Sequence, residues 1–161
     1  MPVRQLKEFL DRNNVKYVNI THSTAYTAQE IAALTHIKGR DLAKTVIVKL
    51  DGVQAMAVLP ASFHVDLERL RISVGAKEAT LASEGEFRIR FPGCETGAMP
   101  PFGNLFQMPV YVDEILTHDQ EISFNSGTHN ELIRLAFADF MRLVKPAVLR
   151  FMAERAVGHA A

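Results

Sequence analysis

Two apolar, β-branched runs in the middle of the chain restrict its fold more than any other feature. The first run is Lys44–Leu50, Asp51-Gly52 follows it, and Val53–Leu59 is a second run of similar length. Strand-like runs on either side of an Asp-Gly pair are typical of a β-hairpin. The sequence therefore predicts an antiparallel hairpin, with Lys44 at the entry of its first strand.

Helix and strand patterns surround this hairpin. Apolar residues at helical spacing in Val3–Leu10 predict a first helix that Asn13-Asn14 ends. Thr27–Glu30 is a capping-box pattern that starts a second helix, and Lys38-Gly39 offers an end for it. Further strands are expected at Val15–Ile20, Met108–Val112, Glu121–Asn125 and around Leu132–Leu135; further helices at Asp66–Leu70, Ala76–Ser83 and Ala138–Val144; and a turn at Asp113–Gln120.

The order of these elements indicates the fold class. They do not alternate in a steady βαβ rhythm, which favours an α+β fold over a doubly wound one. We expect a mixed, largely antiparallel sheet or barrel surrounded by helices. Residues 1–161 are expected to form a single domain, with 146–161 as a C-terminal helical or frayed tail.

Charge and cysteine content limit the kinds of partner and compartment. Lys and Arg number 18, and Asp and Glu also number 18, so the formal net charge is zero. Proteins that bind long stretches of nucleic-acid backbone are usually strongly basic, so an RNA partner is expected only at a small site such as an end. Cys94 is the only cysteine, which excludes an intrachain disulfide. With no signal-peptide pattern or membrane span, a cytoplasmic protein is expected, with no membrane partner.

The Phe91–Met108 segment is the least regular part of the chain. It lacks periodicity and contains three prolines and three glycines. A loop of this length in a compact domain is usually functional or disordered, and its apolar residues argue against disorder. Gly97-Ala98-Met99 offers consecutive backbone N–H groups before the rigid Pro100-Pro101 pair, an arrangement that suits an oxyanion or a polarised water. A stiff packing loop explains the residues equally well.

Other candidate residues each have an ordinary structural interpretation beside a functional one. Lys44 could bind a phosphate at a cleft edge, or be a solvated surface lysine. His129 and His22 could contact a substrate, or serve only to bond nearby carbonyls. Cys94 could be a thiol nucleophile, but no activating base is evident, and a small buried side chain is the more usual role. The scattered histidines show no metal-ligand spacing, so no metal is expected.

Together, several of these segments resemble a known family. Lys44-Thr45 opens a hairpin, Gly97–Gly103 follows with a Gly-x-x-x-Pro pattern, then Met108–Asp113, then a Ser126-Gly127 turn. This order and spacing resemble the YbaK/ProRS-associated editing domain, from the first helix to about Val144. The Ala98 position and the Ser-Gly-Thr-His turn differ from the Gly and Ser-Gly-Gly-Lys forms of many relatives, which leaves alanyl, cysteinyl, seryl and threonyl esters all possible.

The resemblance implies a cytosolic aminoacyl-tRNA deacylase that hydrolyses mischarged tRNA, tRNA(Pro) first among the expected substrates. It implies catalytic roles for Lys44, at the phosphate of the terminal adenosine, and for Gly97, at the aminoacyl carbonyl or attacking water. It also implies substrate-assisted hydrolysis, through a ribose hydroxyl, without a metal or cofactor. The residues expected to bind the substrate are His22, Thr45, Ala98, Met99, Pro100, Pro101, Phe102, Gly103, Ser126, Gly127, Thr128 and His129.

The expected partner is the acceptor CCA end of an aminoacyl-tRNA. A prolyl-tRNA synthetase or an elongation factor could supply further contacts. The protein itself is expected to be a monomer or a weak homodimer. Two alternatives stand beside the deacylase. One is a module of the same fold that captures aminoacyl-tRNA or a synthetase without hydrolysis, and the other is a thiol-dependent hydrolase that uses Cys94.

Overall fold

The predicted hairpin is present at the centre of the molecule. The computed structural model describes residues 2–38 and 41–153. Strands β2 (Leu42–Leu50) and β3 (Val53–Pro60) pair antiparallel from Ala43↔Pro60 to Leu50↔Val53. Asp51 and Gly52 connect them with positive φ angles of 50° and 82°. These angles fit the two-residue hairpin turns for which Asp-Gly is favoured.

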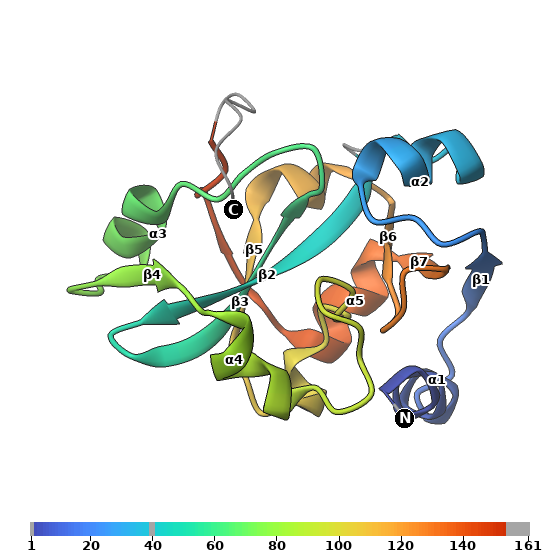
Figure 1. Cartoon of the computed structure of the whole chain (residues 1–161), viewed down its shortest axis with the longest axis horizontal. Coiled ribbons are helices and arrows are strands. Elements are labelled where there is room, and N and C mark those ends of the chain that lie inside the picture. The colour runs from blue at the N-terminus through green and yellow to red at the C-terminus, as the bar shows by residue number, and fades with distance from the viewer. Residues whose placement is uncertain (1, 39–40, 154–161) are drawn as a thin grey trace.

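The other strands extend this hairpin into one mixed sheet, drawn in Figure 1. The strand order is β1-β7-β6-β2-β3-β5-β8, and β4 also pairs with β2. The β1/β7, β7/β6, β2/β3 and β2/β4 ladders are antiparallel, whereas β2/β6, β3/β5 and β5/β8 are parallel. The remaining strands are β1 (Tyr17–Thr21), β4 (Ala79–Leu81), β5 (Val110–Asp113), β6 (Glu121–Asn125), β7 (Glu131–Ala136) and β8 (Ala147–Leu149). The expected α+β class with a largely antiparallel, mixed sheet is confirmed.

Helices pack on the sheet through three apolar clusters. The largest joins α1 and α5 to the sheet and to the Phe91–Met108 loop, a second holds α3, and a third holds α2 against Leu42 and Leu132. In Figure 1, α2 and α3 lie at opposite ends of the hairpin. The helices are α1 (Pro2–Arg12), α2 (Ala28–Thr35), α3 (Leu67–Val74), the short α4 (Glu84–Phe87) and α5 (Phe137–Val144). Short 3₁₀ turns occupy Arg88–Arg90, Gly103–Leu105 and Glu114–His118. None of the described helices is long and apolar enough to cross a membrane.

Three expectations about local structure were wrong. Ala76–Ser83 contains strand β4 rather than a helix, because Gly75 ends α3 in a left-handed conformation and the segment then pairs with β2. The expected tail begins with β8, whose ladder with β5 places Phe151 in the core. Helix α2 ends at Thr35 with His36 as a left-handed cap, ahead of the expected Lys38-Gly39. Gly39 and residues 154–161 lie outside the described residues.

The irregular Phe91–Met108 segment is mostly exposed before Ala98 but buried from Ala98 to Gly103. Phe102 is fully buried, and its ring lies 5.5 Å from that of Phe124 and 5.7 Å from that of Phe140. Beside it, a Cβ built on Gly103 would lie 2.2 Å from the backbone oxygen of Met108 and 2.5 Å from a Val110 methyl. Only glycine allows the backbone to approach the β5 segment this closely. The loop is therefore fixed through its buried stretch from Ala98 to Gly103.

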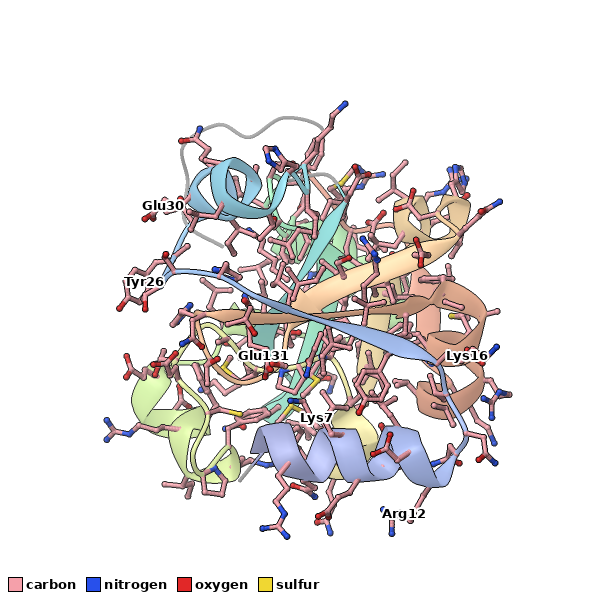
Figure 2. All side chains as sticks on the ribbon, turned by 90° about the vertical axis from the view of Figure 1, so that its right-hand side faces the viewer. Lys7, Arg12, Lys16, Tyr26, Glu30 and Glu131 are labelled. Carbon is pink, nitrogen blue, oxygen red and sulfur yellow. The ribbon has the colours of Figure 1, made fainter. Side chains whose placement is uncertain are left out.

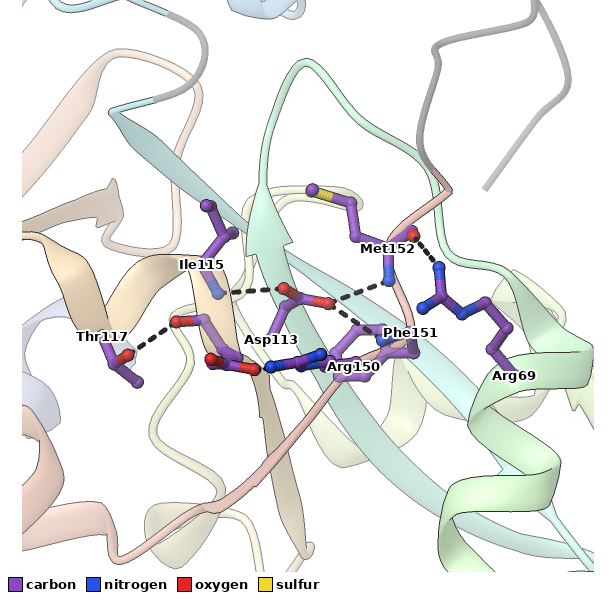
Figure 3. Close-up of polar contacts among 8 residues, drawn as sticks. Arg69, Asp113, Ile115, Thr117, Arg150, Phe151 and Met152 are labelled. Carbon is purple, nitrogen blue, oxygen red and sulfur yellow. Dashed lines mark hydrogen bonds and ion pairs between the residues drawn. The ribbon is translucent and has the colours of Figure 1, made fainter.

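A second fixed point is the buried carboxylate of Asp113, whose contacts are drawn in Figure 3. The Asp113 carboxylate accepts hydrogen bonds from the backbone N–H groups of Ile115, Phe151 and Met152, at 2.8 to 3.0 Å. Backbone donors around one carboxylate are charge-assisted and strong. Asp113 thus joins the end of β5 to the segment that follows β8.

We predict that Gly103→Ala lowers the free energy of unfolding by about 1–3 kcal/mol, because the new methyl group would overlap the Met108 backbone, which is held in place by the packing of the loop. Gly85→Ala is the matched control, since nothing lies within 4 Å of a Cβ at that position. Urea unfolding measures both. Equal stability of the two variants would contradict the close contact at Gly103.

We predict that Asp113→Ala costs about 3 kcal/mol of unfolding free energy, because it leaves buried backbone donors without their charged acceptor. The control is Asp139→Ala, which removes only an exposed ion pair to Arg142 and should cost under about 1 kcal/mol. Thermal or urea unfolding distinguishes the two. Similar losses would show that the Asp113 bonds contribute little.

Candidate active site

Three segments that are distant in the sequence meet at one end of the sheet. They are the loop 22–26 after β1, Glu95–Gly97, and the turn Gly127–Asn130 between β6 and β7. The Ala25 N–H donates to the His129 carbonyl at 2.9 Å, and the Glu95 N–H donates to the Gly127 carbonyl at 2.8 Å. The Glu95 carboxylate also accepts the His129 N–H at 2.5 Å. The predicted Gly-x-x-x-Pro loop and the predicted Ser-Gly-Thr-His turn are therefore in direct contact.

The His129 ring lies at the centre of this junction. The Tyr26 ring covers it at a centroid distance of 4.6 Å, and a Cβ on Gly97 would lie 3.6 Å from its Cε1. His129 Nε2 lies 2.8 Å from the Thr96 carbonyl oxygen, which can only accept, so this nitrogen carries the proton. The other nitrogen, Nδ1, is buried and has no partner among the described residues. In the neutral ring, Nδ1 is a free acceptor.

The Gly-x-x-x-Pro loop presents fewer N–H donors than its sequence suggested. Gly97 has φ +86°, which only glycine adopts readily, and it is exposed. The expectation of three consecutive free donors is wrong, because the Ala98 N–H donates to the Glu95 carbonyl at 3.0 Å. Within the described part of the chain, the N–H groups of Gly97 and Met99 have no partner.

The rest of that loop supports the exposed glycine from below. Pro100, Pro101 and Gly103 are buried, and Phe102 belongs to the core. In the unbound protein they reach no open surface, so any contact they make with a substrate is indirect. The physical reason is the close packing of this half of the loop under β5, described above.

Ser126 and Thr128 support the turn through side-chain hydrogen bonds. Ser126 is fully buried and donates to the Glu131 carboxylate at 3.0 Å, and the Lys7 ammonium pairs with the other oxygen of Glu131 at 3.1 Å. Thr128 donates to the Asn130 side chain at 2.6 Å. Figure 2 shows Lys7 reaching from α1 toward Glu131, while Tyr26 projects outward. Helix α1 therefore holds the turn through a charge pair that the sequence did not reveal.

Lys44 lies on the β2 strand, half-buried and without a partner. Burial lowers the pKa of its ammonium below the ordinary value, and no hydrogen bond or ion pair engages it within residues 2–38 and 41–153. Side chains alternate along a strand, so Lys44 shares the face of Leu42, which packs with Ala25 and Ile31 beneath α2. A half-buried, unpaired ammonium is costly to stability and available to an anion.

The β2/β6 ladder places Lys44 beside the turn. This parallel ladder ends with Leu42↔Ser123 and Ala43↔Phe124, so Lys44 and Asn125 are the next residues of the two strands in the same direction. Asn125 pairs with Leu132, a member of the cluster that contains Leu42. Directly paired residues share a face, so Lys44 and Asn125 lie on the same face. Thr45 is almost fully buried on the opposite face.

Three buried polar atoms near this junction have no partner among the described residues. They are His22 Nε2, Asn125 Oδ1 and His129 Nδ1. The His22 backbone N–H donates to the Asn130 carbonyl at 2.9 Å, which brings His22 to the same turn. Buried polar atoms in native proteins normally have partners, so we take the segments that carry these three atoms as the candidate ligand site. Sequence reasoning missed Asn125, although an amide at the end of an apolar strand was visible.

Two other kinds of site would be a Cys94 nucleophile and a metal site. Burial raises the pKa of the Cys94 thiol to about 11, which leaves it protonated at neutral pH. That protonation state argues against a nucleophile. Within the described residues, no group of three or more His, Cys, Asp or Glu side chains is arranged to hold a metal ion. The candidate catalytic and binding groups are therefore Lys44, the Gly97 loop and the turn Gly127–Asn130.

Comparison with known proteins adds sequence relatives and structures of the same fold. The chain is 28% identical over 156 residues to the multifunctional Ser/Thr-tRNA deacylase ProXp-y of Escherichia coli (strain K12), covering 92% of this chain and 91% of the relative. The hypothetical protein APE2540 superposes with a TM-score of 0.82 at 19% identity, over 92% of this chain and 99% of that one. A putative trans-editing enzyme for prolyl tRNA synthetase superposes with a TM-score of 0.79 at 22% identity, over 94% and 97%.

The family comparison covers the residues described above. The model of the aminoacyl-tRNA editing domain matches residues 22–143, which include His22, Lys44, the Gly-x-x-x-Pro loop and the turn that carries His129. This match extends over well more than half of the chain, and the chain therefore belongs to the aminoacyl-tRNA editing domain family.

Proposed function

We propose that this protein is a deacylase that hydrolyses the ester bond of mischarged aminoacyl-tRNA in trans. The observation that carries the proposal is the unpaired, half-buried Lys44 ammonium, on the sheet face that it shares with Asn125, just before the turn that carries His129. Burial without a counter-ion lowers the pKa of this ammonium, which means that the charged form is disfavoured. A bound anion would stabilise the charged form. The phosphate of the terminal adenosine is such an anion.

Serine and threonine are the amino acids that we expect first on the mischarged tRNA. Support comes from the E. coli relative, whose name describes a multifunctional Ser/Thr-tRNA deacylase. Mischarged tRNA(Pro) is the carrier to test first, with alanyl and cysteinyl esters beside the seryl and threonyl ones. The neutral net charge fits binding centred on the CCA end. A prolyl-tRNA synthetase or elongation factor would then supply contacts to the remainder of the tRNA in the cytoplasm.

The proposed reaction needs orientation more than a protein nucleophile. Water adds to the ester carbonyl, the bond between that carbon and the ribose oxygen breaks, and the water proton passes to the ribose oxygen, which yields free amino acid and tRNA. The free N–H groups of Gly97 and Met99 are the candidates to stabilise the developing oxyanion, and one such donor is worth roughly 10²–10³ in rate. The neighbouring ribose hydroxyl orients the attacking water.

We predict that Lys44→Met lowers kcat/KM for deacylation by about 100-fold, because a charged contact to phosphate is lost. The same change should raise the melting temperature, since it removes a half-buried unpaired charge. The matched control is Lys49→Met on the same strand, whose ammonium pairs with Glu86 at 2.6 Å. This control should keep deacylation. A panel of charged tRNAs and thermal unfolding measure both properties, and a Lys44→Met enzyme with full activity would refute the assigned role.

We predict that Cys94→Ser retains wild-type deacylation within about twofold at neutral pH, because a thiol with a pKa of about 11 supplies almost no thiolate there. The same charged-tRNA assay measures it, with thermal unfolding to confirm the fold. A loss of a hundredfold or more in a folded variant would instead support a thiol-dependent hydrolase.

A further inference from the structure

The three unpartnered polar atoms of the site are all hydrogen-bond acceptors. His129 donates its Nε2 proton to the Thr96 carbonyl, and His22 Nδ1 lies 2.7 Å from the Ser23 carbonyl oxygen, so this nitrogen also carries the proton. Neutral imidazole has one donor and one acceptor nitrogen. His22 Nε2 and His129 Nδ1 are therefore acceptors, as Asn125 Oδ1 is by its nature.

Asn125 is the member of this set that belongs to a strand, which fixes its place relative to Lys44. It ends β6 directly beyond the β2/β6 ladder, on the same sheet face as Lys44. Its cross-strand partner Leu132 is fully buried, as is Ala25 of the same cluster. In such apolar surroundings an amide oxygen without a donor is a substantial cost to stability. A bound group that donates hydrogen bonds would remove this cost.

The carboxylates nearest the three acceptors already bind groups of the protein itself. Glu131 accepts from Ser126 and pairs with Lys7, and Glu95 accepts the His129 N–H. Besides the exposed Glu95 carboxylate, the site thus offers one cation, backbone N–H donors and neutral acceptors. Lys44 and the N–H groups suit the phosphate and the carbonyl of an aminoacyl ester. The acceptors suit its remaining polar group, the α-ammonium, which has three donors and no acceptor.

We propose that Asn125 Oδ1, together with the two histidine acceptors, binds the α-ammonium group of the aminoacyl substrate. This assignment rests on the proposed deacylase function and deepens it, because it makes the site selective for α-amino esters over other acyl esters of tRNA. Asn125 then contacts the substrate directly, beside Lys44.

The test compares two esters that differ only at the α position. Seryl-tRNA and its α-hydroxy analogue, made by deamination with nitrous acid, are hydrolysed by wild type and by Asn125→Leu, and each rate is divided by the spontaneous rate of that ester. Asn125→Leu keeps the side-chain size and removes the acceptor. Asn19→Leu, at an exposed position of β1, is the control, and thermal unfolding confirms that the variants fold.

Wild type is expected to favour the amino ester by 10-fold or more. Asn125→Leu should lose about 10- to 100-fold on the amino ester, as for one hydrogen bond to a charged group, and less than threefold on the α-hydroxy ester. Equal losses on both esters would overturn the proposal. So would a loss on seryl-tRNA with none on alanyl-tRNA, because that result would assign Asn125 to the β-hydroxyl group.

Failure of the deacylase function itself is distinguishable from failure of this inference. If wild type hydrolyses no member of the charged-tRNA panel, the proposed function fails, and the same pair of esters is then compared by Kd. A tenfold preference for the amino ester that Asn125→Leu abolishes would still support ammonium recognition. The absence of any preference in binding would overturn it.

Discussion

Strand β2 is the element on which the rest of the structure depends, because its two edges carry three ladders. One edge pairs with β3 from Ala43 to Leu50, and the other is shared between β6 at the start and β4 at the end. The parallel ladder with β6 consists of only the two pairs Leu42↔Ser123 and Ala43↔Phe124. Beyond it the strands separate, and Lys44 and Asn125 are the first residues past that point. The fork in the sheet therefore accounts for the lack of partners at Lys44 and at Asn125 Oδ1 within the described part of the chain.

Support for the site comes from elements that carry no chemistry. The Phe102 ring and Gly103 fix one half of the Gly-x-x-x-Pro loop in the core, so that only its first residues stay exposed. Glu95 then ties those residues to the His129 turn through two hydrogen bonds. Groups that must orient an ester to within a fraction of an ångström need such rigid surroundings. Because an aminoacyl ester is already activated, its hydrolysis needs little from the protein beyond this orientation.

The sequence predicted the parts of the fold that local chemistry determines. The Asp51-Gly52 hairpin and the Thr27 cap of α2 follow from residues close together in the chain, as does the short helix expected at Asp66–Leu70, which is α3. Strands β4 and β8 did not, because three-residue strands acquire their identity from the partner strand and not from their own residues. The same holds in the site. Gly97 and His129 attracted attention as turn residues, whereas the unpartnered Asn125 oxygen and the Lys7–Glu131 pair depend on contacts that only the fold creates.

The Lys7–Glu131 pair also has a consequence for how the protein is made. Its two residues are 124 positions apart, and β1 likewise pairs with β7 across most of the chain. Contacts of such long range form late, because closing the intervening chain costs entropy before any contact repays it. A nascent chain that has emerged from the ribosome only as far as Met108 already holds Lys44 and the Gly97 loop, but lacks the turn that Glu95 binds. The site is therefore among the last features of the molecule to assemble, and a prematurely terminated product would lack it.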